Sequence, residues 1–328
     1  MRNMFIILKN NFYRAVSRKN YFILMLCISI ITITAAVFFT AKLEVKGNIA
    51  VVSDTGSLYL SSKLLHVEKV DRVPDRASLV MHKYDAAVID RGDGEFEIQT
   101  IRSDDFKKKL EKIIKNQDLS SFKDENSRGV ASNILGYMIM IVFIQGLLYM
   151  LMYSEDRENG TFKRIGVSPV PAGVYLAGHG IFNFLMVFLP TYLLIISVKI
   201  IFGINIGLSF IQYAGILGLL TFLATGFSLF ISSLFKKADS SNMAGQSIAV
   251  LTSLLAGCFY SFDNGNEVMK KIISILPQKN LISLVQAIEH GKSFNALVPQ
   301  LTYMIAFSAV LFVLAAAIVK INFKKGEC

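Results

Sequence analysis

Few residues in this chain of 328 have the types and spacing that catalysis requires. Gly291-Lys292-Ser293 has the ending of a phosphate-binding loop, but such a loop also needs a glycine five residues before Gly291, where Gln286 stands. We interpret the match as a chance one. The sequence therefore predicts that ATP is not bound by this chain.

Metal ligation and acid–base chemistry have no better support. The four histidines have no metal-binding spacing, and the three cysteines are too far apart to suggest a disulfide framework or a metal site. Asp85 and Asp90 flank a predicted strand, where a structural role is favoured over a catalytic one. We identify no catalytic constellation, and we expect neither enzyme activity nor a cofactor in this chain.

A run of charged residues lies between two long apolar segments, residues 134–153 and 180–201. Ser154 can cap a helix, and the acidic residues that follow favour the positive N-terminal end of that helix. Gly166 can end it, because glycine adopts the left-handed conformation that closes many helices. The run predicts a short, stiff surface helix over residues 154–166, which could pass force from a soluble partner into a bilayer. An ordinary solvated loop is the alternative.

The composition places the chain in a membrane. Hydrophobic residues make up 53% of it, and its mean hydropathy of +0.50 is too high for an ordinary soluble protein. Several apolar runs are long enough to cross ~30 Å of hydrocarbon. They predict an all-α polytopic membrane domain with six transmembrane helices, at residues 21–41, 134–153, 180–201, 211–235, 243–262 and 297–320.

The interiors of these spans hold essentially no ionisable side chains. Lys199 sits at a span end and His179 begins one, while Gln145 and Gln246 are neutral. Carriers driven by protons or sodium ions need ionisable or densely polar groups within the bilayer. If this protein transports a solute, we expect the energy to come from another subunit.

Residues 1–20 precede the first span and contain five Lys or Arg residues and no acid. Phe5, Leu8, Phe12 and Val16 recur at helical spacing, which predicts an amphipathic basic helix on the inner leaflet. The alternative is the charged start of a signal peptide. Residues 21–41 are longer than a signal core and lack a convincing cleavage pattern, so we expect an uncleaved span.

Residues 42–133 differ in character, because charges of both signs return and apolar residues come in short bursts. We expect a small α/β extracytoplasmic domain between spans one and two. Its predicted strands are residues 48–53, 85–90 and 95–101, and its predicted helices are residues 57–66, 75–83 and 104–117.

The remaining segments fix the expected topology. Lys and Arg concentrate in segments that would be cytoplasmic, so both termini, including the tail 321–328, are expected inside the plasma membrane. The net charge of +10 reflects this bias rather than nucleic-acid binding. Residues 263–296 contain two apolar stretches separated by Pro277, which predicts two short outer helices. They are a candidate outer gate or, equally, an interfacial hairpin with no gating role.

The charged run carries the most specific part of a resemblance between this chain and a known protein family. Order and topology together make the chain similar to the membrane subunits of the ABC type-2 exporter family, in the variety with an extracytoplasmic domain after the first span. The resemblance covers essentially the whole chain. The family often has Gly-Lys where this chain has Gly178-His179. The matching motif residues are Glu155, Glu158, Gly160-Thr161, Lys163-Arg164, Ser168-Pro169 and Leu276-Pro277.

The resemblance implies a mechanism and partners. A separate ABC ATPase subunit would hold ATP and Mg, and a second permease subunit would pair with this one as a homodimer or with a related chain. The ATPase would dock on a coupling helix whose residues are Glu155, Asp156, Arg157, Glu158, Gly160, Thr161, Lys163 and Arg164. By analogy, the second and fifth spans would line the pathway through Phe143, Leu147, Ser247 and Leu251.

Two functions remain open at this stage. The first is the permease subunit of an ATP-driven exporter that moves a hydrophobic or amphipathic cargo, such as a lipid-like molecule, a drug or an antimicrobial peptide. The second is a membrane sensor or scaffold whose outer domain binds a ligand and signals to a cytoplasmic partner without transport. A lipid-modifying enzyme is disfavoured, because no acid, base or metal ligands group at headgroup level.

Overall fold

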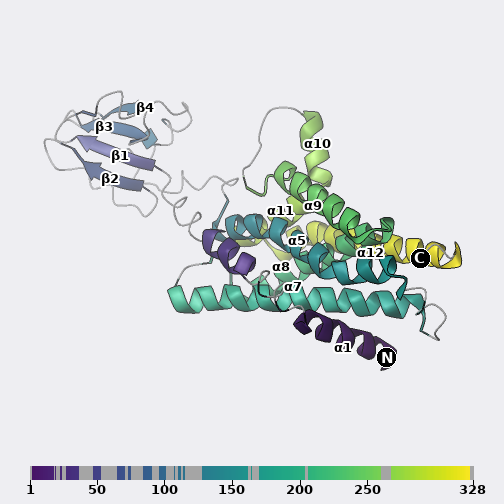
Figure 1. The fold of residues 1–328 in the computed structure, drawn as a ribbon. Coiled ribbons are helices and arrows are strands. Elements are labelled where there is room, and N and C mark those ends of the chain that lie inside the picture. Colours follow the sequence, from purple (N-terminus) through teal and green to yellow (C-terminus); the bar gives the residue numbers. More distant parts are fainter. Residues whose placement is uncertain are drawn as a thin grey trace. The chain divides into compact units, whose positions relative to one another are not determined.

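The computed structural model divides into two compact units, Met1–Val37 with Arg128–Cys328, and Phe38–Ser127. Each unit is described by itself (Figure 1). The described residues are 2–17, 27–36, 47–52, 65–70, 84–90, 96–100, 128–161, 170–203, 206–259 and 267–325, with a few isolated positions between them.

The smaller unit is built on a four-stranded sheet of order β2-β1-β3-β4. Strand β1 (Gly47–Val52) pairs in parallel with β2 (Leu65–Lys69) and with β3 (Ala86–Asp90), and β4 (Phe96–Thr100) runs antiparallel to β3. Parallel neighbours require crossover connections, which agrees with an α/β unit, and the expected extracytoplasmic α/β domain stays a prediction. One face of the sheet forms its core, with Ile49, Val51, Ala86, Val88, Ile98 and Leu110 buried together.

Three of these strands match the predicted ones to within a residue or two at each end. Strand β2 was missed, because the predicted helix at 57–66 overlaps it at Leu65 and His66. This edge strand is only partly buried, so its residues lack the continuous apolar run that identifies β1 and β3. The predicted helix at 75–83 lies outside the described residues, whereas described positions within 104–117 are helical.

The larger unit is a bundle of long helices. Within the described residues, four helices are long and apolar enough to cross a membrane: α5 (Val130–Glu158), α7 (Ala172–Phe202), α8 (Phe210–Leu234) and α12 (Phe294–Lys325). Three of them contain a whole predicted apolar run, and α8 ends at Leu234, one residue before the end of the predicted run 211–235. Helix α5 begins at Val130, so its first turn takes in residues that the predicted outer domain, 42–133, had included. These helices are consistent with a polytopic membrane domain.

The other two predicted spans, residues 21–41 and 243–262, correspond to shorter helices in the structure. Cys27–Ala36 is a shorter apolar helix, and most other residues of 21–41 lie outside the described residues. Helix α9 (Ala238–Leu255) begins five residues before the predicted start of its span and includes the polar residues Asp239 and Asn242. Its polar first half explains why it is less apolar than the four long helices.

The segment between α9 and α12 contains the two predicted short helices, α10 (Glu267–Ile275) and α11 (Pro277–Glu289). Pro277 is the first residue of α11, where its missing N–H leaves no hydrogen bond unmade. The break at this proline is confirmed. A gating role for the pair stays a prediction.

Helix α1 (Arg2–Ser17) lies beside α7 (Figure 1). A Cβ added at Gly178 of α7 would lie 2.7 Å from Cγ2 of Ile7, so the glycine allows the two helices to approach closely. Asn11 and Ala15 are buried in this contact, while Phe5 and Val16 remain exposed. The predicted amphipathic helix is confirmed, and its position on the inner leaflet stays a prediction.

Candidate functional site: the charged end of α5

The charged run does not begin a new helix. Ser154 is buried inside α5, which continues without a break from the apolar run to Glu158. Asn159 then closes the helix, and Gly160 takes a left-handed φ of +67°. The predicted start at Ser154 is therefore wrong, because serine tolerates a helix interior and nothing before Gly160 stops the helix. The predicted end at Gly166 lies outside the described residues.

A second helical turn follows Gly160. Thr161 and Arg164 are helical, and the backbone N–H of Arg164 donates to the carbonyl of Gly160 at 3.4 Å. Arg164 is exposed, whereas Lys163 lies outside the described residues. The structure thus separates the predicted coupling residues into a set at the end of α5, of which Asp156 and Arg157 are buried, and a set after Gly160.

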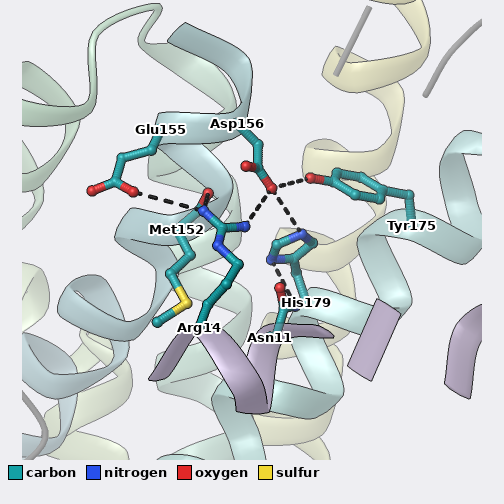
Figure 2. A network of polar contacts seen from close by, with 7 residues as sticks. All are labelled: Asn11, Arg14, Met152, Glu155, Asp156, Tyr175 and His179. Carbon is teal, nitrogen blue, oxygen red and sulfur yellow. Dashed lines mark hydrogen bonds and ion pairs between the residues drawn. The ribbon is translucent and has the colours of Figure 1, made fainter. Parts of the chain in front are cut away.

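Asp156 is the centre of the buried set (Figure 2). Its Oδ2 accepts hydrogen bonds from Nη1 of Arg14 at 2.9 Å and from the hydroxyl of Tyr175 at 2.5 Å. The carboxylate lies in the C-terminal turn of α5, where the helix dipole disfavours negative charge. Arg14 of α1 and Tyr175 of α7 supply the compensating interactions, so Asp156 joins three helices.

His179 completes this cluster. Its Nδ1 lies 3.2 Å from Nδ2 of Asn11, and its Nε2 lies 3.7 Å from Oδ2 of Asp156. When Nδ1 accepts from the Asn11 amide, the imidazole proton is on Nε2, facing Asp156. The ring also packs edge-on against Tyr175, with centroids 4.6 Å apart. His179, expected at the inner surface, is 2% exposed and forms part of the α1–α7 contact.

Glu155 is half-buried, between the buried Asp156 and Arg157 and the exposed Glu158. Its Oε2 lies 3.7 Å from Nη2 of Arg14, and the same nitrogen donates to the carbonyl of Met152 at 3.4 Å. Arg14 therefore lies between Glu155 and Asp156 in the last turn of α5 (Figure 2), and Asp156 is the more buried of the two acids.

Arg157 points to a different helix. Its Nη1 donates to the carbonyls of Ser232 and Phe235, at 2.7 and 3.1 Å. These carbonyls close the C-terminal end of α8, where a cation satisfies orphan acceptors and is favoured by the helix dipole. Arg157 is 6% exposed, so the guanidinium is held almost entirely inside the protein.

Glu158 points to a fourth helix. Its Oε2 accepts from the backbone N–H of Ala238, the first residue of α9, at 2.9 Å. Lys237 at the N-cap makes no side-chain cap of its own, so Glu158 supplies the acceptor that this helix start needs. Four consecutive residues of α5 thus contact four helices. Glu155 and Asp156 bind α1, and Asp156 also binds α7, while Arg157 binds α8 and Glu158 binds α9.

A matching arrangement holds the other end of α5. Glu289 of α11 accepts from the backbone N–H groups of Ala131 and Ser132, at 2.6 and 3.2 Å. Arg128 donates to the carbonyls of Gly257 and Cys258, which close the end of α9. Burial lowers the pKa of the Arg128 guanidinium from its ordinary value. Charged groups at helix ends therefore fix α5 at both ends.

The predicted pathway residues do not share one surface. Phe143 and Leu147 of α5 are buried, the first against Phe227 of α8 with ring centroids 5.2 Å apart. Leu147 packs against α9 at Gly245. Ser247 and Leu251 lie on the exposed side of α9. The structure leaves open a shared pathway role, which stays a prediction.

Sequence reasoning missed Asn11, Arg14 and Tyr175. Asn11 lies four residues after Ile7, and Arg14 lies three residues after Asn11, so all three share one face of the helix. That spacing was the available signal, but it does not identify the partner. Among the described residues, no group of three His, Cys, Asp or Glu could hold a metal ion.

The fold and the site show long apolar helices that are joined by charged residues at the two ends of one helix, α5. A family model described as ABC-2 family transporter protein matches residues 94–317. The match covers more than half of the chain, which therefore belongs to this family of membrane transport proteins.

A curated relative is the linearmycin resistance permease protein LnrN of Bacillus subtilis (strain 168), 26% identical over 215 residues. The matched region covers 63% of this chain and 55% of the relative. The chain thus spans about half the length of the relative that it matches.

Proposed function

We propose that this protein is the permease subunit of an ATP-driven ABC exporter, moving a hydrophobic or amphipathic cargo out of the cytoplasm or the inner leaflet. Membership in the ABC-2 family supports the transporter class. The name of the relative, a resistance permease, supports efflux of a harmful compound rather than uptake. The apolar character of the long helices favours a lipid-like molecule, drug or peptide over an ion.

The observation that carries the proposal is the charged end of α5. Asp156, Arg157 and Glu158 bond to separate helices over distances of 2.5 to 3.1 Å. A displacement of this end is transmitted to α1, α7 and α8, because the bonds of the buried Asp156 and Arg157 are costly to break, and to α9 through the exposed Glu158. A permease without its own energy source needs such a junction at the place where the ATPase subunit contacts it.

The proposed coupling element is the turn that follows Gly160, with Thr161 and the exposed Arg164. In this arrangement a separate ATPase subunit contacts that turn and Glu155. The buried charges of α5 then carry the motion inward. Gly160 serves as the joint between the contact surface and the long helix, with its left-handed φ of +67°.

The proposed topology has six spans, with residues 21–41 as the first and α9 as the fifth. Both termini and the charged end of α5 are cytoplasmic, and the sheet-containing unit is extracytoplasmic. The exposed side of α9, with Met243, Ser247 and Leu251, is the proposed contact for a second permease subunit.

Purification from native membranes tests the proposal, with identification of the proteins retained. An ABC ATPase should be recovered, and cargo movement in vesicles should require it. Recovery of a kinase or regulator in place of an ATPase would support the sensor function instead. Solute movement by the purified chain alone would refute the proposal.

A further inference from the structure

Helix α1 has two faces of different character. Ile7, Asn11 and Arg14 lie on the face that contacts α5 and α7. The opposite face carries large side chains that are between 56 and 72% exposed, although they are apolar or aromatic. An exposed apolar face of this kind marks an interaction surface. Its members are Phe5, Ile6, Tyr13 and Val16.

The charge on this face restricts what can cover it. Lys9 is exposed and lies four residues after Phe5 and four before Tyr13, so it shares their side of the helix. Its ammonium group lies 5.8 Å from the centre of the Tyr13 ring. Residues 1–20 contain five Lys or Arg residues and no acid. The cover must therefore be both apolar and negatively charged, which describes the interface of a bilayer that contains anionic phospholipid.

The contact with α7 places α1 at the depth of that interface. Ile7 and Phe12 contact Gly178 and Phe182, which lie about 9 and 15 Å from the start of α7 at 1.5 Å per residue. The 31 residues of α7 extend over about 46 Å, against ~30 Å of hydrocarbon. A centred α7 thus enters the hydrocarbon about 8 Å from its start. The contact lies just inside this boundary, where amphipathic helices bury their apolar faces.

One rotational setting of α1 serves both faces. Lys9 and Asn11 are two residues apart, which puts them about 200° apart around the helix. When Lys9 faces lipid, Asn11 therefore faces His179 of α7, and Arg14 can donate to Asp156 of α5. A lipid that binds the outward face of the docked helix stabilises the docked state, because a ligand favours the state that binds it.

We propose that the face formed by Phe5, Ile6, Lys9, Tyr13 and Val16 binds anionic phospholipid, and that this lipid holds α1 against the charged end of α5. The headgroup pairs with Lys9, and the acyl chains cover the apolar and aromatic side chains. The lipid surface can be tested on the permease alone. Its effect on coupling to an ATPase rests on the proposed function.

The absence of tryptophan from the sequence provides a clean assay. Tyr13→Trp places a single fluorophore on the face and keeps an aromatic ring beside Lys9. Ile305→Trp, at a position of α12 that is 54% exposed, is the reference reporter. Each protein is reconstituted in vesicles of phosphatidylcholine and phosphatidylglycerol, with one lipid or the other brominated. Bromine quenches tryptophan, so the quenching reports which lipid lies beside the reporter.

At Tyr13→Trp, phosphatidylglycerol should be enriched about fivefold over phosphatidylcholine, the factor expected for one lysine near an anionic surface. Ile305→Trp should show no preference. Adding Lys9→Gln to Tyr13→Trp should remove most of the preference, whereas Lys292→Gln, at an exposed position between α11 and α12, should leave it unchanged. Added salt should weaken the preference by screening the lysine.

Equal quenching by the two brominated lipids at Tyr13→Trp would overturn the proposal. So would a preference for phosphatidylglycerol that survives Lys9→Gln or is as large at Ile305→Trp. Loss of quenching when the ATPase subunit is added would assign the face to that protein instead of to lipid.

Docking is measured by spin labels at Ser17 of α1 and Asn159 at the end of α5, both exposed, after replacement of the three native cysteines. The distance distribution should be narrower with phosphatidylglycerol than in pure phosphatidylcholine, and Lys9→Gln should remove this difference. Equal distributions in both lipids would refute the holding role. ATP hydrolysis by the permease–ATPase complex should follow the same dependence. Docking that responds to lipid while hydrolysis does not would count against the proposed coupling and leave the lipid surface standing.

Discussion

Arg14 in α1 and Asp156 in α5 are 142 residues apart in the chain, yet Nη1 of Arg14 lies 2.9 Å from Oδ2 of Asp156. This pair fastens the N-terminal helix to the end of the central span. Asp156→Asn should lower stability by about 2 kcal/mol, because the partly buried guanidinium loses its charged partner. Thermal unfolding in detergent measures the effect, with Asp239→Asn, exposed in the first turn of α9, as the control. Equal shifts in both variants would contradict the assignment.

Two arginines permit a matched test of the two parts of the predicted coupling run. Arg157→Met should lower stability by about 2 kcal/mol, because the carbonyls of Ser232 and Phe235 lose a buried charged donor. Arg164→Met, at an exposed position, should change stability by less than about 0.5 kcal/mol. For partner binding the order should reverse, with Arg164→Glu reducing ATPase retention more than Arg157→Met. If Arg157→Met reduces ATPase retention more than Arg164→Glu does, the contact with the ATPase lies at the end of α5 instead.

The sequence predicted the long helices because an apolar run of span length has few other stable conformations. Pro277 likewise marked the break between α10 and α11 through its missing N–H. The charged run was harder, since Ser154 and the acids after it give the same local signal whether they start a helix or end one. Their partners Arg14 and Ala238 are 142 and 80 residues away from Asp156 and Glu158. Such long-range contacts have no local signature.

Gly160 should be sensitive to a side chain for conformational reasons alone. Gly160→Ala should cost about 1 kcal/mol, because φ is +67° there although an added Cβ would meet nothing within 4 Å. Gly173→Ala, in a helix and equally open, should be neutral or stabilising. Thermal unfolding of the two variants compares them directly. A loss of the same size at both positions would remove Gly160 as a conformational joint.

The contact between α1 and α7 can be tested by a size exchange. Gly178→Val should loosen α1, because a Cβ at this position would lie 2.7 Å from Cγ2 and 3.1 Å from Cβ of Ile7. Adding Ile7→Ala should restore part of the lost stability by making room. Limited proteolysis of the N-terminal helix reports its docking. Additive losses in the double variant would mean that these residues do not pack together.

Glu289 should act as an acceptor for the start of α5. Glu289→Ala should cost about 1–2 kcal/mol, because the N–H groups of Ala131 and Ser132 lose their partner. Glu289→Gln retains one acceptor oxygen and should cost less than half as much. Unfolding midpoints of the two variants check the order. If Glu289→Gln has the lower unfolding midpoint of the two variants, the carboxylate has a role other than accepting these hydrogen bonds.

The central claim is that the charged end of α5 makes α1 and α9 move as one body when the ATPase acts. Spin labels at Val16 and Asp239, both exposed, measure the distance between these helices in the permease–ATPase complex. The account predicts the same distance distribution in nucleotide-free and ATP-trapped states of the wild type, and a shift on trapping when Glu158→Ala removes the link to α9. A shift in the wild type, or no shift in either protein, would contradict it.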